Sequence, residues 1–310
     1  MKRLRIVFMG TPQFAVASLN ALYQSDHEIV GVVTVADKPA GRGQQIRFSE
    51  VKQYALEHDL PVFQPEKLKD ENFINTLQSL QADLFVVVAF RMLPEVVWSM
   101  PPLGTINLHG SLLPAYRGAA PINRAIMNGE SETGVTTFFL QQEIDAGSII
   151  LQKSIAIEEN ETAGELHDRM MNTGAETLKE TVDLIASEKA DAVKQDVLIA
   201  QGRTLKHAPK IFKEDMRIDW NRPVQEVHNH VRGLSPYPAA WTLLQGKVLK
   251  VFFGRMELAS IENIAGEMTT DQKTFLRFAC TNGWYYITDL QWEGKKRMSV
   301  EEFLRGFKNQ

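Results

Sequence analysis

The sequence contains very little cysteine. Cys280 is the single cysteine among 310 residues, so no internal disulfide can form and no site built from several cysteines can hold a metal. This usage fits a reducing compartment. Cys280 itself is expected to be a small packed apolar side chain rather than a reactive thiol.

Long apolar runs are also missing. The purest run, Leu84 to Phe90, is far shorter than the roughly 20 residues that a membrane-spanning helix needs. The first residues carry the charges of a signal peptide, but their apolar stretch stops at Met9 and continues into a strand-turn-helix pattern. The sequence therefore predicts a cytoplasmic protein without membrane contact.

Neither sign of charge dominates the chain, whose formal net charge is −4. The charges divide unevenly, because residues 1–189 carry 16 Lys and Arg against 24 Asp and Glu, and residues 190–310 carry 18 against 14. A mildly basic second part is compatible with contact to nucleic acid. An ordinary solvated surface would give the same numbers.

What the chain does contain, over residues 1–189, is an alternation of strand-like runs and helical patterns. The run FVVVA is apolar on both faces, as in a parallel sheet covered by helices. Helix starts are expected at Thr11-Pro12, at Ser49 and at a capping box from Thr162 to Glu165. The pattern predicts a doubly wound parallel α/β domain. Its expected strands include residues 4–9, 28–35, 83–89 and 104–109.

The pattern changes after Lys189. Residues 190–208 are mixed and polar, which predicts a linker, and residues 209–310 predict a short helix at 223–232 followed by β structure. Strand-like runs flank Gln245-Gly246 and Asn282-Gly283, two turn signals typical of hairpins. A small antiparallel barrel is therefore expected as the second domain.

The turn after the first strand reads Gly10-Thr11-Pro12 where a dinucleotide fold would place its glycines. The sequence GTPQFA lacks the GxGxxG pattern, which disfavours a nicotinamide cofactor. A tight strand-to-helix turn explains these residues without a ligand. Gly41-Arg42-Gly43 is open in the same way to two interpretations, a phosphate-binding loop or a surface turn.

The stretch from Gly104 to Pro121 carries the chemistry. Asn107 and His109 are two residues apart in an expected strand, so both side chains project to one face near the strand's carboxyl end, where open α/β sheets bind ligands. Asp145 lies in a turn before another apolar strand and could supply a carboxylate there. Each residue alone is explained by structure, as a hydrogen-bonded histidine or a turn carboxylate. Together they suit acyl transfer between amines, with no Ser or Cys nucleophile and no metal.

This stretch resembles the signature of the 10-formyltetrahydrofolate-dependent formyltransferases. The matching residues are His109-Gly110-Ser111-Leu112-Leu113-Pro114 and Tyr116-Arg117-Gly118. The resemblance implies a catalytic set of Asn107, His109 and Asp145, a Rossmann-like first domain and an OB-like barrel. It also implies a folate-binding loop formed by Ser111, Leu112, Leu113 and Pro114. Pterin contacts would come from the backbone of Arg91, Met92 and Leu93, although FRMLP is one residue shorter here than the family's usual Tyr-Gly-x-Ile-Leu-Pro.

Over nearly the whole chain, the resemblance is to the family members that formylate methionyl-tRNA. It rests on MGTPQFA, on Lys38 to Gly43 and on Ser235-Pro236-Tyr237-Pro238. The implied reaction moves a formyl group from 10-formyltetrahydrofolate to the amino group of methionyl-initiator tRNA, for translation initiation. The implied partners are this tRNA and the folate, with a monomer as the default state. Two alternatives stay open: an amino-sugar formyltransferase, and a non-catalytic nucleic-acid-binding protein.

The loop from Lys38 to Arg47 separates the two acceptor classes in this comparison. Its cations Lys38, Arg42 and Arg47 have no acidic neighbour after Asp37, and we expect them to bind tRNA near its acceptor end. Residues 206–256 add nine Lys and Arg against four acids. The barrel, residues 209–310, is accordingly expected to bind tRNA.

Overall fold

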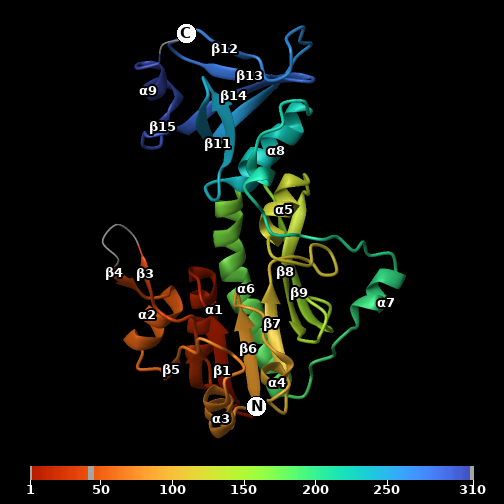
Figure 1. Cartoon of the computed structure of the whole chain (residues 1–310). Helices are drawn as coiled ribbons and strands as arrows, with labels where there is room; N and C mark the ends of the chain where they lie inside the picture. The colour runs from red at the N-terminus through yellow and green to blue at the C-terminus, as the bar shows by residue number, and fades with distance from the viewer. Residues whose placement is uncertain (1, 41–44, 308–310) are drawn as a thin grey trace. The chain divides into compact units, whose positions relative to one another are not determined.

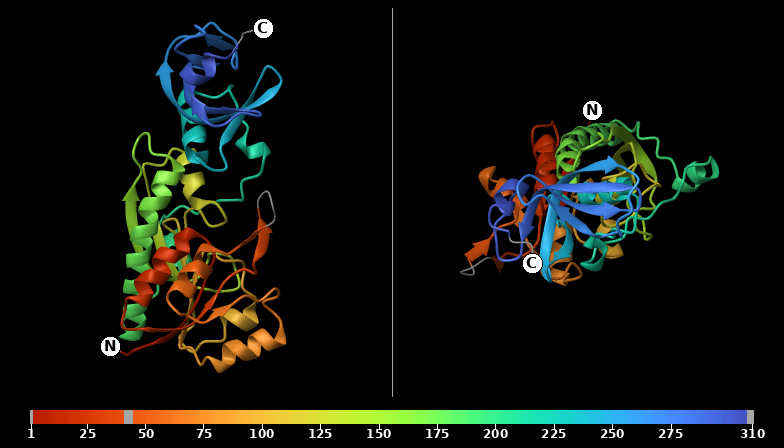
Figure 2. Two further views of the ribbon diagram at one scale, coloured as in Figure 1. Left: turned by 90° about the vertical axis from the view of Figure 1, so that its left-hand side faces the viewer. Right: turned by 90° about the horizontal axis from the view of Figure 1, so that it is seen from above.

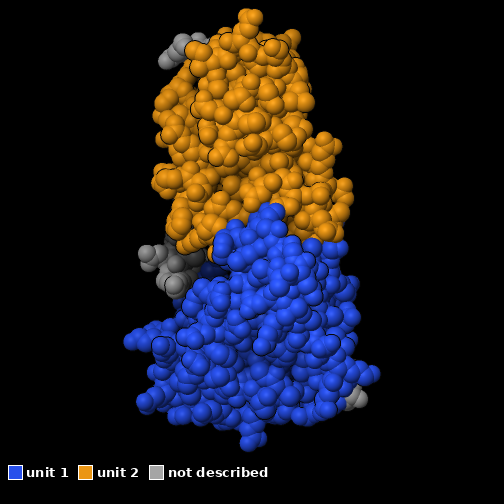
Figure 3. Space-filling view, turned by 90° about the vertical axis from the view of Figure 1, so that its right-hand side faces the viewer, with its two compact units in different colours: residues 1–118, 134–155, 167–207 blue, residues 119–133, 156–166, 208–310 orange. Residues whose placement is uncertain are grey.

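The structure is a computed structural model that describes residues 2–40 and 45–307. The chain forms two compact units, coloured separately in Figure 3. The first consists of residues 1–118, 134–155 and 167–207, and the second of residues 119–133, 156–166 and 208–310.

The first unit is built on a seven-stranded sheet in the order β5-β2-β1-β6-β7-β8-β9 (Figure 1). The strands from β5 to β7 pair in parallel, which confirms the predicted parallel sheet. Strand β8 runs antiparallel to β7 and makes the sheet mixed. The strands are β1 (Arg5–Gly10), β2 (Glu28–Val33), β5 (Val62–Phe63), β6 (Leu84–Val88), β7 (Thr105–His109), β8 (Glu132–Phe139) and β9 (Ile149–Ala156).

Helices cover both faces of this sheet (Figures 1 and 2). Helices α1 (Gln13–Tyr23) and α6 (Ala163–Ala186) lie side by side, and the rings of Phe14 and His167 are 5.2 Å apart. On the opposite face, α3 (Glu71–Ser79) and α4 (Glu95–Trp98) pack against alternate residues of the strands, such as Val7 and Val87. The alternation of strand side chains between these two layers is what makes the sheet apolar on both faces.

The predicted helix starts are largely confirmed. Ser49 caps α2 (Glu50–Glu57) by accepting a hydrogen bond from the Lys52 amide. Thr162 and Glu165 form the capping box of α6 through reciprocal bonds of 2.8 and 3.3 Å. Helix α1 begins after Pro12. One face of α6 consists of buried apolar residues: Leu166, Met170, Leu178, Val182 and Ile185.

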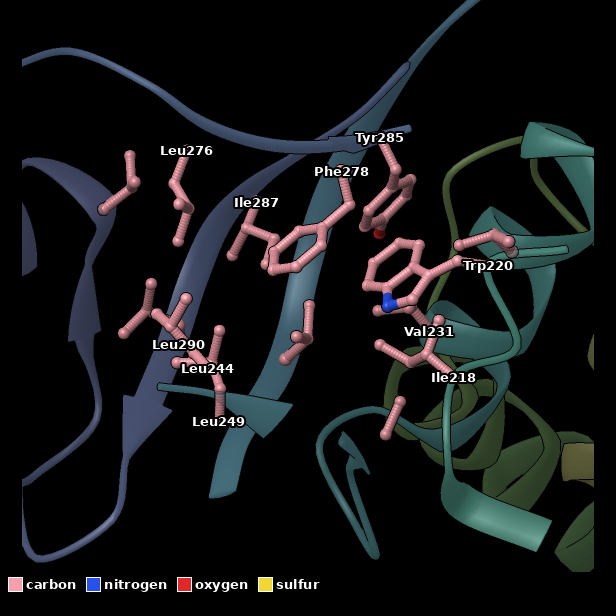
Figure 4. Close-up of a cluster of buried hydrophobic side chains, with 14 of the residues drawn as sticks. Ile218, Trp220, Val231, Leu244, Leu249, Leu276, Phe278, Tyr285, Ile287 and Leu290 are labelled. Atoms are coloured by element: carbon pink, nitrogen blue, oxygen red, sulfur yellow. The ribbon is translucent and has the colours of Figure 1, made fainter. Parts of the chain in front are cut away.

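The second unit is an antiparallel half-barrel with α8 (Val224–Leu234) and α5 (Pro121–Met127). Figure 4 shows its core, in which the rings of Trp220 and Phe278 stack 4.5 Å apart. Cys280 lies in this core, and burial raises the pKa of its thiol to about 12, as expected of a packed, inert cysteine. The strands are β10 (Ala240–Leu244), β11 (Lys247–Leu258), β12 (Met268–Thr270), β13 (Leu276–Cys280), β14 (Gly283–Trp292) and β15 (Met298–Ser299).

Both predicted hairpins form, but one turn is shifted. Gln245 and Gly246 adopt positive φ between β10 and β11, as predicted. In the second hairpin Cys280 pairs with Gly283, so the turn residues are Thr281 and Asn282. Gly283 belongs to the strand, where a Cβ would lie 2.2 Å from the Glu257 carbonyl oxygen. Glycine is needed there for backbone proximity and not for turn geometry.

Four further elements complete the described chain: β3 (Lys38–Ala40), β4 (Gln45–Arg47), α7 (Gln195–Ala200) and α9 (Val300–Leu304), with a 3₁₀ turn at Glu214–Met216. Within residues 2–40 and 45–307, none of the helices has the length and apolar character needed to cross a bilayer.

Candidate active site

Strand β7 presents Asn107 and His109 on one face. Its alternate residues face the other way, since a Cβ on Gly174 of α6 would lie 2.9 Å from the Leu108 side chain. Asn107 pairs with Val87 of β6 and with Phe138 of β8. The two polar side chains therefore lie on the face opposite α6, about 7 Å apart along the strand.

His109 is held between two acceptors. It is 6% exposed, and its Nε2 lies 2.8 Å from the Tyr116 carbonyl oxygen. Because a carbonyl can only accept, Nε2 carries the hydrogen of this bond. Nδ1 then faces Oδ2 of Asp145 at 3.7 Å, which is longer than a hydrogen bond. Nδ1 is the ring nitrogen left to exchange a proton.

Asp145 is fixed by the segment that holds His109. Its Oδ2 accepts a hydrogen bond of 2.9 Å from the Gly118 amide. Its backbone has φ 53°, in the left-handed region, and Tyr116 has φ 64°. Non-glycine residues in this region need support from their surroundings, and such residues gather at functional sites.

Asn107 differs from its neighbours in having free donors. It is half-buried, and within the described part of the chain its amide has no hydrogen-bond partner. An unengaged amide on the face that carries His109 can donate to the oxygen of a substrate. The structure thus brings Asn107, His109 and Asp145 to one place, while their catalytic roles stay predictions.

The predicted folate loop is held by hydrogen bonds within its own segment and from Thr136 of β8. Ser111 donates to the Ala115 carbonyl at 2.6 Å, and Ser111, Leu113 and Pro114 are buried while Leu112 is half-buried. Thr136 donates to the Ser111 carbonyl at 2.6 Å and accepts from the Leu113 amide at 3.1 Å.

Thr136 and Gln152 are functional candidates that the sequence did not reveal. Gln152 donates to the Leu113 carbonyl and to Thr136 Oγ1, both at 2.9 Å. Thr136 stands opposite His109 in the β7–β8 register. Thr136 could have been predicted as a neighbour of His109 if the pairing register of β7 and β8 were known. The sequence alone does not give this register.

The predicted pterin segment follows β6, the neighbour of β7. The Arg91 side chain turns away to the Glu66 and Pro65 carbonyls, and burial lowers the pKa of its guanidinium. Leu93 is buried in the core beside α3, and Met92 is 73% exposed. The Arg91 side chain is thus engaged within the protein, and a pterin contact from the backbone of this segment stays a prediction.

The predicted tRNA-binding residues lie on a separate hairpin. Lys38 of β3 pairs with Arg47 of β4, and Arg47 is exposed. Arg42 lies outside the described residues. Asp37 is already engaged by Lys52, whose hydrogen bond, with that of Gln64, lowers the pKa of Asp37.

Comparison with known proteins identifies the family. The Formyl transferase family matches residues 4–182, and its C-terminal domain matches residues 210–308. The methionyl-tRNA formyltransferase of Bacteroides fragilis is 53% identical over 310 residues, covering 98% of this chain and 95% of the relative. The chain belongs to the methionyl-tRNA formyltransferase family.

Two further proteins are similar to this chain, one in sequence and one in fold. The methionyl-tRNA formyltransferase of Flavobacterium johnsoniae is 49% identical over 310 residues, covering 99% of this chain and 97% of the relative. The fold is shared with the N-formyltransferase from Helicobacter canadensis, solved in complex with folinic acid and dTDP-3-aminofucose. That likeness has a TM-score of 0.65 at 19% identity and covers 95% of this chain and all of the other.

Proposed function

We propose that this family member transfers the formyl group of 10-formyltetrahydrofolate to the free amino group of methionyl-initiator tRNA, which yields N-formylmethionyl-tRNA for translation initiation. The observation that carries the proposal is the His109–Asp145 pair on the strand face of Asn107, whose amide has no hydrogen-bond partner among the described residues. It occurs in a chain 53% identical to a methionyl-tRNA formyltransferase over almost its full length.

The reaction needs an oxygen to be stabilised and a proton to be moved. The amine attacks the formyl carbon, the bond from that carbon to the folate nitrogen breaks, the amine loses a proton and the folate nitrogen gains one. Asn107 would donate to the oxygen that becomes negative. His109 would hold or move the proton at Nδ1, because Nε2 is engaged by Tyr116.

Asp145 faces the ring nitrogen that would hold this proton. Its carboxylate oxygen lies 3.7 Å from Nδ1, close enough to stabilise a positive ring by charge. The hydrogen bond from Gly118 keeps that oxygen in place. Because two substrates must meet in line, positioning would supply much of the rate gain.

For the donor, we propose contacts from Ser111, Leu112, Leu113 and Pro114 and from the backbone of Arg91, Met92 and Leu93. The bracing by Thr136 and Gln152 supports this assignment, since a rigid loop loses little entropy on binding.

For the acceptor, we propose that Lys38, Arg42 and Arg47 bind the phosphates of tRNA near its acceptor end. The engagement of Asp37 by Lys52 supports this, because the carboxylate next to the hairpin is already bound to a cation of α2. We also propose that residues 1–189 carry the groups that touch the substrates, that 190–208 link the domains while packing on the first unit, and that 209–310 add affinity for tRNA.

The test is a direct assay with 10-formyltetrahydrofolate and charged initiator tRNA. Formyl transfer to the methionyl amine is the expected result, and a dTDP-linked amino sugar offered in parallel should remain unformylated. Transfer to the sugar alone would replace the proposal with the amino-sugar alternative. Binding of tRNA without any transfer would favour the non-catalytic one.

A further inference from the structure

Gln195 is buried in the first unit with every polar atom of its amide engaged. It is the first residue of α7 and is 1% exposed. Its Nε2 donates to the backbone carbonyls of Asp145 and Gly147, at 2.8 and 2.9 Å. Its Oε1 accepts from Nε and Nη2 of Arg117, at 3.0 and 2.8 Å. One side chain thus joins two segments of the candidate active site.

Both of those segments contact the catalytic pair directly. Arg117 lies between Tyr116, whose carbonyl binds His109, and Gly118, whose amide binds the Asp145 carboxylate. The carbonyls that Gln195 holds belong to Asp145 itself and to Gly147, two residues later. Gln195 therefore ties the backbone of Asp145 to the segment that orients its side chain.

The backbone conformation of the turn at Asp145 requires support of the kind that these hydrogen bonds provide. Its backbone is in the left-handed region, which a non-glycine residue keeps only when the surroundings enforce it. Its neighbour Gly147 is tightly packed, since a Cβ there would lie 1.7 Å from the Phe139 carbonyl oxygen.

The chain around Gln195 is anchored to the same unit at two points. Val193 exchanges two hydrogen bonds of 2.8 Å with Ile149, and the Arg117 amide donates to the Lys206 carbonyl at 3.0 Å. Gln195 is thus presented to the turn by a fixed segment.

We propose that Gln195 is a positioning residue for the formyl transfer, which sets the backbone of Asp145 so that its carboxylate stands at Nδ1 of His109. It acts through Asp145 and touches neither substrate. The inference rests on the proposed function, because it assigns Gln195 a part in that same reaction.

The substitution Gln195→Glu distinguishes the acceptor role of the amide oxygen from the donor role of the amide nitrogen. The glutamate keeps an acceptor for Arg117, which is strengthened by charge. It loses both donors and turns a carboxylate oxygen toward the carbonyls of Asp145 and Gly147. The turn at Asp145 should shift, while Arg117 stays matched.

The experiment measures steady-state formylation by the full chain. For Gln195→Glu we expect kcat to fall by about tenfold to a hundredfold with both KM values within about twofold, since a displaced group costs rate more than binding. Gln201→Glu is the matched control, because it introduces the same charge at an exposed residue that follows α7. It should retain wild-type kcat.

A double-mutant cycle with Asp145→Asn distinguishes positioning from a general structural role. If Gln195 acts through Asp145, Gln195→Glu should change kcat by less than about twofold in the Asp145→Asn background. A loss of equal size in both backgrounds would overturn the proposal, and so would wild-type kcat in the folded single variant.

Two provisions keep the result interpretable. If the charged variant does not fold by circular dichroism, Gln195→Asn takes its place with the same expectations, because it keeps the amide but falls short by one methylene. If the proposed function itself is wrong, wild type and Gln201→Glu will also fail to formylate methionyl-tRNA.

Discussion

The stability of the second unit should depend on the ionisation of one buried histidine. His228 of α8 is 1% exposed, and its ring lies 6.1 Å from that of Phe253 and 6.1 Å from that of Tyr285. Burial lowers the pKa of His228 to about 4, and the positive charge of Arg232 adds to this. The Glu159 backbone opposes the shift, but it makes no hydrogen bond of normal geometry with the ring.

The sign of the effect follows from the direction of the shift. The pKa of histidine in the unfolded chain is about 6.5, so between pH 6.5 and 4 the unfolded state binds the proton more readily than the folded state. The contribution of neutral His228 is present in full above pH 6.5 and is lost as the pH falls toward 4. A shift of this size corresponds to about 3 kcal/mol, of which roughly 2 to 3 kcal/mol should be lost between pH 7.5 and 4.5.

Urea unfolding followed by tryptophan fluorescence measures this loss, because four of the five tryptophans lie in residues 209–310. His228→Leu removes the titrating group. The decrease in unfolding free energy from pH 7.5 to 4.5 should therefore be smaller in this variant by about 2 to 3 kcal/mol. His230, whose pKa is also lowered by burial, should supply part of the remaining dependence. Equal decreases in wild type and variant would refute the reasoning.

Three further predictions concern catalysis, tRNA and the barrel. His109→Ala and Asp145→Asn should each lower kcat by about a hundredfold or more in a folded protein, and near-normal turnover would remove that residue from the mechanism. Arg42→Leu should weaken transfer to methionyl-tRNA, reduce its salt dependence by about one counterion and leave folate binding unchanged; equal activity at every salt concentration would contradict it. Gly283→Ala should destabilise the second unit by about 2 kcal/mol or more, because its Cβ would meet the Glu257 carbonyl, whereas Gly246→Ala should cost only about 1 kcal/mol. Urea unfolding compares the two, and equal losses would contradict the assignment of Gly283 to the strand.

The features predictable from the sequence were those that depend on short-range periodicity. A spacing of two placed Asn107 and His109 on one face, and the capping box fixed the start of α6. The resemblance to a formyltransferase signature added the family, which the comparisons confirm.

Features that depend on contacts between distant segments were not predictable. Gln195 binds a carbonyl 50 residues away, and nothing in its neighbourhood distinguishes it from any polar residue of a linker. Strand β8 runs antiparallel to β7, and the alternation of side chains along a strand gives no information on its direction. The Asn282-Gly283 signal predicted the hairpin correctly but the turn residues wrongly. Gly283 is a glycine because the Glu257 backbone of β11, a strand that begins 36 residues earlier, packs against it.

The choice of acceptor is best sought in the Lys38–Arg47 hairpin and not in the presence of a second domain. The Helicobacter canadensis N-formyltransferase shares the fold over 95% of this chain, yet it was solved with an amino-sugar nucleotide. A barrel after the sheet domain is therefore compatible with either acceptor class. The proposed roles of Asn107 at the oxygen and of the His109–Asp145 pair at the proton would suit any amine acceptor, because they involve no other part of it. The proposed contacts of this hairpin with tRNA would add recognition of a polyanion, since Arg47 is exposed and the preceding Asp37 is already bound by Lys52. Exchange of this hairpin between the two classes should accordingly alter the KM for the acceptor while leaving folate binding as it was.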